Sequence, residues 1–227
     1  MIRSSGESKV RLIGRRMFII SAAKAVVVFG IIGTTASAYE TVMTTGEIKP
    51  VGEYTLTPEL QFLSDPSGVD VAAHLELPID EGSAFRAEAG VGTTDMFLGA
   101  YFKFIPFPDV EGQPAVGLNS GLNYAADAGL STFTARFEPI VSKKLSTGFG
   151  YLLPYGSLPV GIKHRTSGND RNDVAFQVAA GMEIMINSWK GLRLMPEFGI
   201  NLDNSTNYIS IAAVLDFDNE GFHLSFE

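Results

Sequence analysis

The chain alternates between apolar and polar or small residues, and the pattern is clearest in residues 173–186, DVAFQVAAGMEIMI. Even positions there are all apolar, from Val174 to Ile186, whereas odd positions from Asp173 to Glu183 are polar or small. Successive side chains of a β-strand point to opposite faces. The stretch therefore predicts a strand whose two faces meet different environments.

Similar alternation recurs along most of the later chain, separated by turn-forming residues such as the Asp-Pro-Ser-Gly of 65–68. The predicted strands cover about 53–62, 69–79, 85–91, 96–105, 116–124, 132–141, 149–162, 173–186, 192–202 and 209–217. No helical period occurs after the first 38 residues. Ten hairpin-linked strands predict an all-β, antiparallel up-and-down barrel of about ten strands. Eight or twelve strands are also possible. Residues 39–52 or 218–227 can add a strand to the count.

Two details of this prediction concern the middle of the chain. Ser142, Lys143 and Lys144 predict a tight turn after the sixth strand. In the seventh strand the apolar residues change from odd positions (Leu153, Tyr155) to even positions after Gly156. A change of phase of this kind is typical of a β-bulge, which we expect at Gly156.

The N-terminus reads as an export signal that precedes the barrel. Residues 1–38 combine six basic residues with an apolar run at 25–33, AVVVFGIIG, and end in Ala36-Ser37-Ala38. This order predicts a signal peptide cleaved after Ala38. The apolar run is shorter than the roughly 20 residues that span a bilayer. Arg15-Arg16 leaves a twin-arginine export route open beside the general one. Residues 39–52 are then a leader, 53–217 the barrel, and 218–227 a tail or short extra strand.

Charge and composition exclude several classes of function. Removing the six basic residues and one acid of residues 1–38 leaves 11 basic and 24 acidic residues, a net charge of about −13. So acidic a chain repels phosphate backbones, and we expect no nucleic-acid partner. The chain has no cysteine, so disulfides and cysteine-linked lipid are excluded.

Composition also predicts which face of the barrel points outward. The polar face is thin in lysine and rich in Gly, Ala, Asn, Gln and Thr, as a confined interior requires, whereas the apolar face carries no charge. The predicted strands approach the 9–11 residues that a tilted membrane strand needs. Aromatic residues near strand ends are candidates for interfacial girdles: Tyr54, Phe62, Phe104, Tyr124, Phe133, Phe149, Tyr208 and Phe217.

With these features the chain resembles the small outer-membrane β-barrel proteins of Gram-negative bacteria, over the signal and about residues 53–217. The resemblance is architectural and involves no diagnostic motif. It implies a transmembrane, porin-like barrel in the cell outer membrane. Its partners would be outer-membrane lipid and, during biogenesis, periplasmic chaperones and the barrel-assembly machinery. Members usually end on an aromatic residue, whereas Glu227 follows Phe226 here. The oligomeric state stays open.

On this reading the charged residues of the polar face project into the lumen and form a charge network. They are Glu59, Asp70, His74, Glu76, Arg86, Glu88, Lys103, Arg136, Glu138, Glu183, Arg193 and Glu197. His74 and Glu76 share a face and could form a general base, but no serine in a nucleophile context accompanies them. No metal-ligand cluster or phosphate-binding loop occurs, so we expect no cofactor and no metal.

Three functions remain open at this stage. The first is an integral outer-membrane barrel with a structural or weak solute-permeation role. The second is a soluble exported barrel that binds an apolar ligand, and the third is an outer-membrane enzyme that modifies lipid. We expect no enzymatic activity. In the first case the turns near Asp80, Pro106, Ser142 and Trp189 face the periplasm, and those near Asp65, Thr93, Asp127, 164–172 and Asp203 face outward.

Overall fold

The computed structural model describes residues 40–64, 67–127, 129–166 and 171–226, which belong to one compact unit, Thr34–Glu227. The expected signal peptide, residues 1–38, lies outside the described residues. Strands make up most of the described chain, and none of it forms a helix long and apolar enough to cross a membrane. The strands are β1 (Tyr54–Ser64), β2 (Ser67–Asp80), β3 (Ser83–Gly92), β4 (Met96–Phe107), β5 (Ala115–Asp127), β6 (Leu130–Ser142), β7 (Leu145–Thr147), β8 (Gly150–Ser157), β9 (Val160–Thr166), β10 (Arg171–Ile186), β11 (Trp189–Lys190), β12 (Leu192–Asp203), β13 (Tyr208–Asp218), β14 (Gly221–Phe222) and β15 (Ser225–Phe226).

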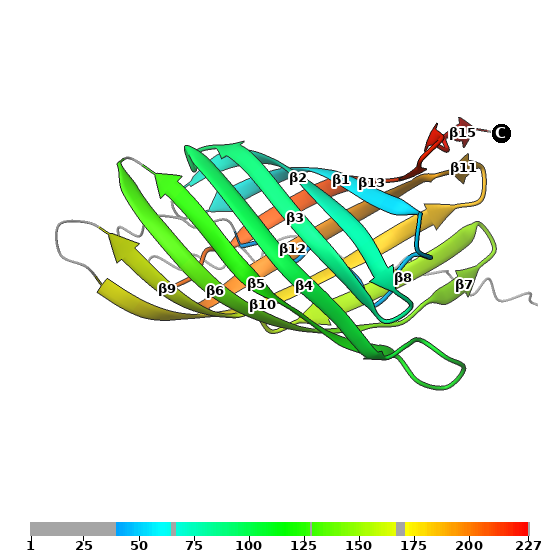
Figure 1. The fold of residues 1–227 in the computed structure, drawn as a ribbon, viewed down its shortest axis with the longest axis horizontal. Coiled ribbons are helices and arrows are strands. Elements are labelled where there is room, and N and C mark those ends of the chain that lie inside the picture. The colour runs from blue at the N-terminus through cyan, green and yellow to red at the C-terminus, as the bar shows by residue number, and fades with distance from the viewer. Residues whose placement is uncertain (1–39, 65–66, 128, 167–170, 227) are drawn as a thin grey trace, which may run out of the picture. The chain divides into compact units, whose positions relative to one another are not determined.

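These strands form a closed antiparallel barrel (Figure 1). Each wall strand pairs with the next along the chain, and β13 returns to pair with β1, where Ile211 faces Leu60. With β8 and β9 counted as one wall strand, the wall has ten strands. The all-β, ten-stranded barrel expected from the sequence is therefore confirmed. We call the end where β1 begins the near end and the end where β1 finishes the far end.

The turn expected at Ser142–Lys144 is wrong. The amide of Lys143 donates to the carbonyl of Pro154, at 3.2 Å, and the register with β8 continues unchanged from β6 into β7. The chain reverses only at residues 148–149, before Gly150. Ser142, Lys143 and Lys144 are residue types that favour a turn. At the rim of a barrel, however, an extended pair of lysines can continue the pairing with the neighbouring strand.

The bulge expected at Gly156 is also wrong. Ser157 pairs with Ala179 and Val160 pairs with Phe176, in one unbroken register across Leu158 and Pro159. Proline has no N–H, so it weakens the ladder at this point without shifting it. Odd positions consequently keep facing inward throughout β8 and β9, and the apolar pair Leu153 and Tyr155 is buried inside the barrel.

The outer face is apolar and the inner face is polar. Leu122 and Ile209 on the outside are each 67% exposed, whereas Asp70 and Arg86 on the inside are 0% and 1% exposed. A soluble barrel has the opposite arrangement, with its apolar residues inside. The wall strands are also long, with 13 residues in β6 and 16 in β10. Both properties are typical of barrels that span a membrane.

One of the aromatic residues expected in the girdles points the other way. Tyr208, at the start of β13, is 3% exposed and donates from its hydroxyl to Glu197 at 2.5 Å. It faces inward because alternate residues of β13, namely Tyr208, Ser210 and Ala212, all point into the barrel. Phe104 and Phe133, at strand ends elsewhere, are about half exposed on the outer face.

Residues 40–49, most of the expected leader, form no strand and lie inside the barrel. We call them the plug segment. Its first residue, Glu40, bonds to Thr206 at the far end, and its last, Lys49, pairs with Asp216 at the near end. A turn closed by the bond from the Glu53 amide to the Pro50 carbonyl then leads into β1. The segment therefore runs along the lumen from the far end to the near end.

The tail adds short strands beyond the barrel wall. β14 folds back on β13, where Phe222 faces Phe217, and β15 pairs with β11 at the near end. The rings of Phe217 and Phe222 are 5.3 Å apart. This small sheet extends the near end, as Figure 1 shows at β11 and β15.

We predict that Val178→Arg blocks assembly, whereas Gln177→Ala assembles. Val178 lies midway along β10 on the outer face, where arginine costs about 2–4 kcal/mol in hydrocarbon. Gln177 is buried inside, and its loss removes a neutral bond to the Thr206 carbonyl worth about 1 kcal/mol. The measurement is the fraction of each variant in the heat-modifiable, SDS-resistant form. Equal fractions for Val178→Arg and the parent protein would contradict the orientation.

Candidate functional site

The interior of the barrel gathers the chemistry of this chain. All twelve charged residues that the sequence assigns to the lumen lie on inner-face positions. Eleven are buried and Glu76 is half-buried. Ten of them form three groups that are spaced along the barrel and linked by the plug segment. Glu197 bonds to the plug segment itself, and Asp70 accepts from the Thr94 amide at 2.9 Å.

The first group is centred on His74 and Arg86, on β2 and β3. His74 Nε2 lies 2.7 Å from Glu59 Oε2, and Arg86 Nη2 lies 2.8 Å from His74 Nδ1. A guanidinium can only donate, so Nδ1 accepts and Nε2–H donates to Glu59. Glu88 completes the group 3.5 Å from Nδ1 and accepts from the Tyr101 hydroxyl at 2.8 Å. With His74 neutral, the group holds one guanidinium and two carboxylates, and each carboxylate accepts hydrogen bonds from neighbouring side chains.

The second group lies on β5 and β6. Arg136 Nη2 lies 2.7 Å from Glu138 Oε1, and Asn119 donates to the other oxygen of Glu138 at 2.6 Å. Both members of the ion pair are almost fully buried. A buried pair with an added hydrogen bond is the arrangement in which attraction offsets the cost of desolvation.

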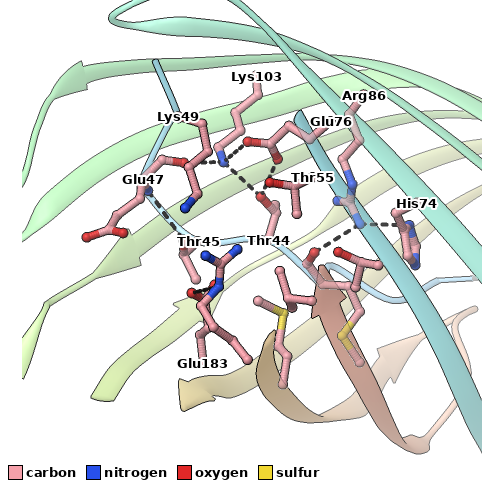
Figure 2. A pocket seen from close by; sticks show the side chains of 15 residues that line it. Thr44, Thr45, Glu47, Lys49, Thr55, His74, Glu76, Arg86, Lys103 and Glu183 are labelled. Carbon is pink, nitrogen blue, oxygen red and sulfur yellow. Dashed lines mark hydrogen bonds and ion pairs between the residues drawn. The ribbon is translucent and has the colours of Figure 1, made fainter. Parts of the chain in front are cut away.

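The third group lies at the near end, where the lumen is hollowed. Lys103 lies 2.8 Å from Glu76, while Arg193 pairs with Glu183 at 2.7 Å and with Asp216 at 2.5 Å. The hollow measures about 450 Å³ including its open mouth. Figure 2 shows Lys103 and Glu76 on one side of it, opposite Glu183. Acids and bases alternate around the hollow, so its wall has no patch of a single charge.

The plug segment occupies the space between these groups. The Arg86 guanidinium donates to the carbonyls of Val42 and Met43, and Arg136 donates to the carbonyl of Glu40 at 3.0 Å. Glu197 completes the set from the other side of the lumen. Its two oxygens accept from the amides of Val42 and Met43, at 2.8 and 2.7 Å. The same arginines therefore hold the wall carboxylates and the plug backbone together.

Nearer the β1 start, the segment makes close backbone contacts. The Gly46 amide donates to Ser142 Oγ at 2.9 Å, and Lys103 donates to the Glu47 carbonyl at 2.6 Å. A Cβ at Gly46 would lie 2.6 Å from the Cβ of Ala115, so a larger residue there would collide with the wall. Glycine lets the backbone come this close.

At the far end the plug segment is anchored by Glu40. Its carboxylate pairs with Lys163 and accepts from the Ser205 hydroxyl and, at 3.0 Å, from the Thr206 amide. Sequence reasoning missed both Glu40 and Lys163. Unbroken alternation along β8 and β9 would have placed Lys163 inside, directly after outward-facing Ile162. Nothing local to Glu40 indicates its position, because residues 40–46 are buried on all sides and so lack a period.

The arrangement can hold a chain segment and close the lumen through hydrogen bonds and ion pairs. The two ring nitrogens of His74, which the sequence grouped with Glu76, bond to Glu59 and Arg86. In the described ranges, no group of three or more His, Cys, Asp or Glu residues could hold a metal ion.

No protein-family model matches the chain, and no curated protein sequence matches it. Among solved structures, it is similar to the translocator domain of autotransporter NalP from Neisseria meningitidis, with 9% identity and a TM-score of 0.43, over 74% of this chain and 89% of that one. It is also similar to the beta domain of the Bordetella autotransporter Brka, with 10% identity and a TM-score of 0.38, over 75% of this chain and 100% of that one.

We predict that Glu197→Gln destabilises the protein by about 3 kcal/mol, because a buried carboxylate that accepts several hydrogen bonds is replaced by a group that accepts fewer. Glu197 accepts from two plug amides and from the hydroxyls of Tyr155 and Tyr208. The measurement is the temperature at which the SDS-resistant form is lost. The matched control is Glu81→Gln in the exposed β2–β3 turn, which should change stability by less than about 0.5 kcal/mol. Equal effects for both variants would contradict the role of Glu197.

Proposed function

We propose that this chain is an integral outer-membrane β-barrel with a structural role, whose own N-terminal segment closes the lumen and makes solute permeation weak. The observation that carries the proposal is the combination of an uncharged, exposed apolar wall with a charged interior filled by residues 40–46. The first feature requires a hydrocarbon environment. The second supports weak permeation, because buried side chains and residues 40–46 occupy the described part of the lumen, which in a wide porin holds water.

The outer wall supports the location in a membrane. Exposed Leu, Ile, Val and Phe residues occur on every one of the ten wall strands, including Leu60, Val71, Val91 and Leu98 on the first four. Soluble monomers rarely expose contiguous apolar patches larger than a few hundred Å². A barrel apolar around its circumference is stable where lipid covers it, so we propose outer-membrane lipid as its main partner. Chaperones and the barrel-assembly machinery are proposed partners during biogenesis.

The interior argues against a soluble barrel that binds an apolar ligand. An apolar ligand would have to displace the plug segment and face Arg86, Arg136 and Glu197, which would lose their hydrogen bonds without replacement. An unsatisfied buried charge costs several kcal/mol. The bonded state of His74 likewise favours a non-enzymatic role over lipid hydrolysis.

We predict that the protein sediments with outer membranes and resists extraction by alkaline carbonate, because its apolar wall partitions into lipid. Fractionation of cells that express the full chain, followed by immunoblotting, measures this. Recovery of most of the protein in the soluble periplasmic fraction without detergent would overturn the proposal.

We predict that the far end faces the outside of the cell and the near end the periplasm, since outer-membrane barrels keep their N-terminal strand start and short turns in the periplasm. Two turn glycines mark the insertion points, Gly129 at the far end and Gly148 at the near end, and both have open space around them. Gly129 has a φ of 81°, so each tag is inserted after the glycine and leaves it in place. An epitope tag inserted at Gly129 should be labelled on intact cells, and one at Gly148 only after the outer membrane is permeabilised. The reverse result would invert the topology.

A further inference from the structure

The wall of the lumen contacts the main chain of the plug segment as well as its side chains. Arg86 and Arg136 donate to plug carbonyls, and Glu197 accepts from plug amides. Ser142 accepts from the Gly46 amide, and Lys103 donates to the Glu47 carbonyl. Main-chain groups are the same in every peptide. Wall groups that bind them therefore recognise a polypeptide backbone rather than one sequence.

Side-chain contacts add a short pattern to this recognition. Glu40 lies in a site built from Lys163, Ser205 and the Thr206 amide, which suits a carboxylate. The side chains of Val42 and Met43 belong to an apolar cluster inside the barrel, formed with Ile140, Tyr155, Ala179, Met195, Ala212 and Val214. The wall thus favours an acidic residue followed, two and three positions later, by two apolar residues.

The polar contacts of the intervening and following side chains are simple. Thr41 donates to Glu59 and Thr44 to Glu76, both at 3.1 Å. A serine at either position could make the same bond, because only the hydroxyl is used. The space at Gly46 admits no side chain. The wall around the plug segment therefore requires small hydroxyl residues and a glycine, and does not require the particular residues present.

The plug segment is joined to the wall by an exposed link. Val51 is 66% exposed, and Gly52 has open space around it and a φ of 99°. The wall contacts described above come from residues before this link. Cutting the chain at Val51–Gly52 would leave every one of them in place. Another peptide could then take the place of the cut segment in the lumen.

We propose that the lumen is a binding site for a peptide with the pattern acidic, hydroxyl, apolar, apolar, hydroxyl, small, glycine, and that it accepts such a peptide from another chain in place of residues 40–46. This inference rests on the proposed closed barrel, because it makes the closing segment an exchangeable ligand. The ligand class is a polypeptide recognised by its backbone and by this pattern, with Glu40 and the pair Val42–Met43 setting the register.

The test uses the full chain with a site-specific protease sequence inserted between Val51 and Gly52, folded in detergent and then cut. Fluorescent peptides are added, and their binding to the SDS-resistant barrel is measured by anisotropy. Peptide one has the sequence of residues 40–50. Peptide two, ESILSSGEIKP, keeps the pattern but replaces every residue from 41 to 45 by another of the same class. Peptide three is peptide one with N-methyl groups on the amides equivalent to Val42 and Met43. Peptide four carries Glu40→Lys.

Peptides one and two should bind within about threefold of each other, because they share the backbone contacts and the pattern. Peptides three and four should bind at least about tenfold more weakly, since each loses charge-assisted hydrogen bonds to the wall. Failure of peptide one to bind the cut, folded barrel would overturn the proposal. Equal binding of peptides one and three would overturn the role of the backbone, and failure of peptide two alone would overturn the sequence tolerance.

A second measurement needs no cut and covers the case in which cutting unfolds the barrel. The chain has no cysteine, so Thr45→Cys supplies a unique thiol inside the lumen. Excess peptide one should raise the rate at which a maleimide labels this thiol, and peptide three should not. No increase with peptide one would overturn the proposal. Carbonate extraction and surface labelling of the uncut protein test the closed barrel separately, so the two failures are distinguishable.

Discussion

The constraint on which the rest of the structure depends is that each charge inside the barrel has left water and needs a partner there. The outer wall avoids this demand by carrying no charge on the face that would meet lipid. The interior meets it with pairs such as Arg136–Glu138 and with shared groups such as Arg86, which serves His74 and two plug carbonyls. Each such charge alone would carry the full cost of desolvation. The attraction of a well-placed, hydrogen-bonded partner offsets that cost.

The plug segment belongs to this charge balance and does more than fill space. Two arginines on β3 and β6 present more donors than the wall carboxylates accept, and the carbonyls of residues 40–43 accept the remainder. Glu197 has the complementary excess of acceptors, which two plug amides and two tyrosine hydroxyls satisfy. The segment therefore completes the hydrogen bonding of the wall from both sides.

The sequence could predict which residues of a strand share a face, because that depends only on the alternation of residue types. The alternation of residues 173–186 indicates the two faces, and the absence of charge on one of them indicates which face lies outside. It could not predict the plug segment, because residues buried on every side show no period and their contacts are distant in sequence. Glu40, for example, pairs with Lys163 on β9. The prediction failed at Lys143 because the residue types there favour a turn. It failed at Gly156 because the inward-facing Leu153 and Tyr155 are apolar and imitate a change of phase, whereas the register with β10 continues unchanged.

Closure of the lumen and stability of the barrel therefore rest on the same contacts. If residues 40–46 left, Arg86, Arg136 and Glu197 would face a narrow aqueous lumen, in which water could replace the plug carbonyls and amides. The net contribution of each bond is then the modest difference between a protein partner and a water partner, about 1 kcal/mol for neutral groups and more for charged ones. Several such bonds acting together hold the segment firmly, while no single one makes it permanent. This balance allows a segment held by many modest contacts of its backbone and side chains to be both a structural element and a replaceable ligand.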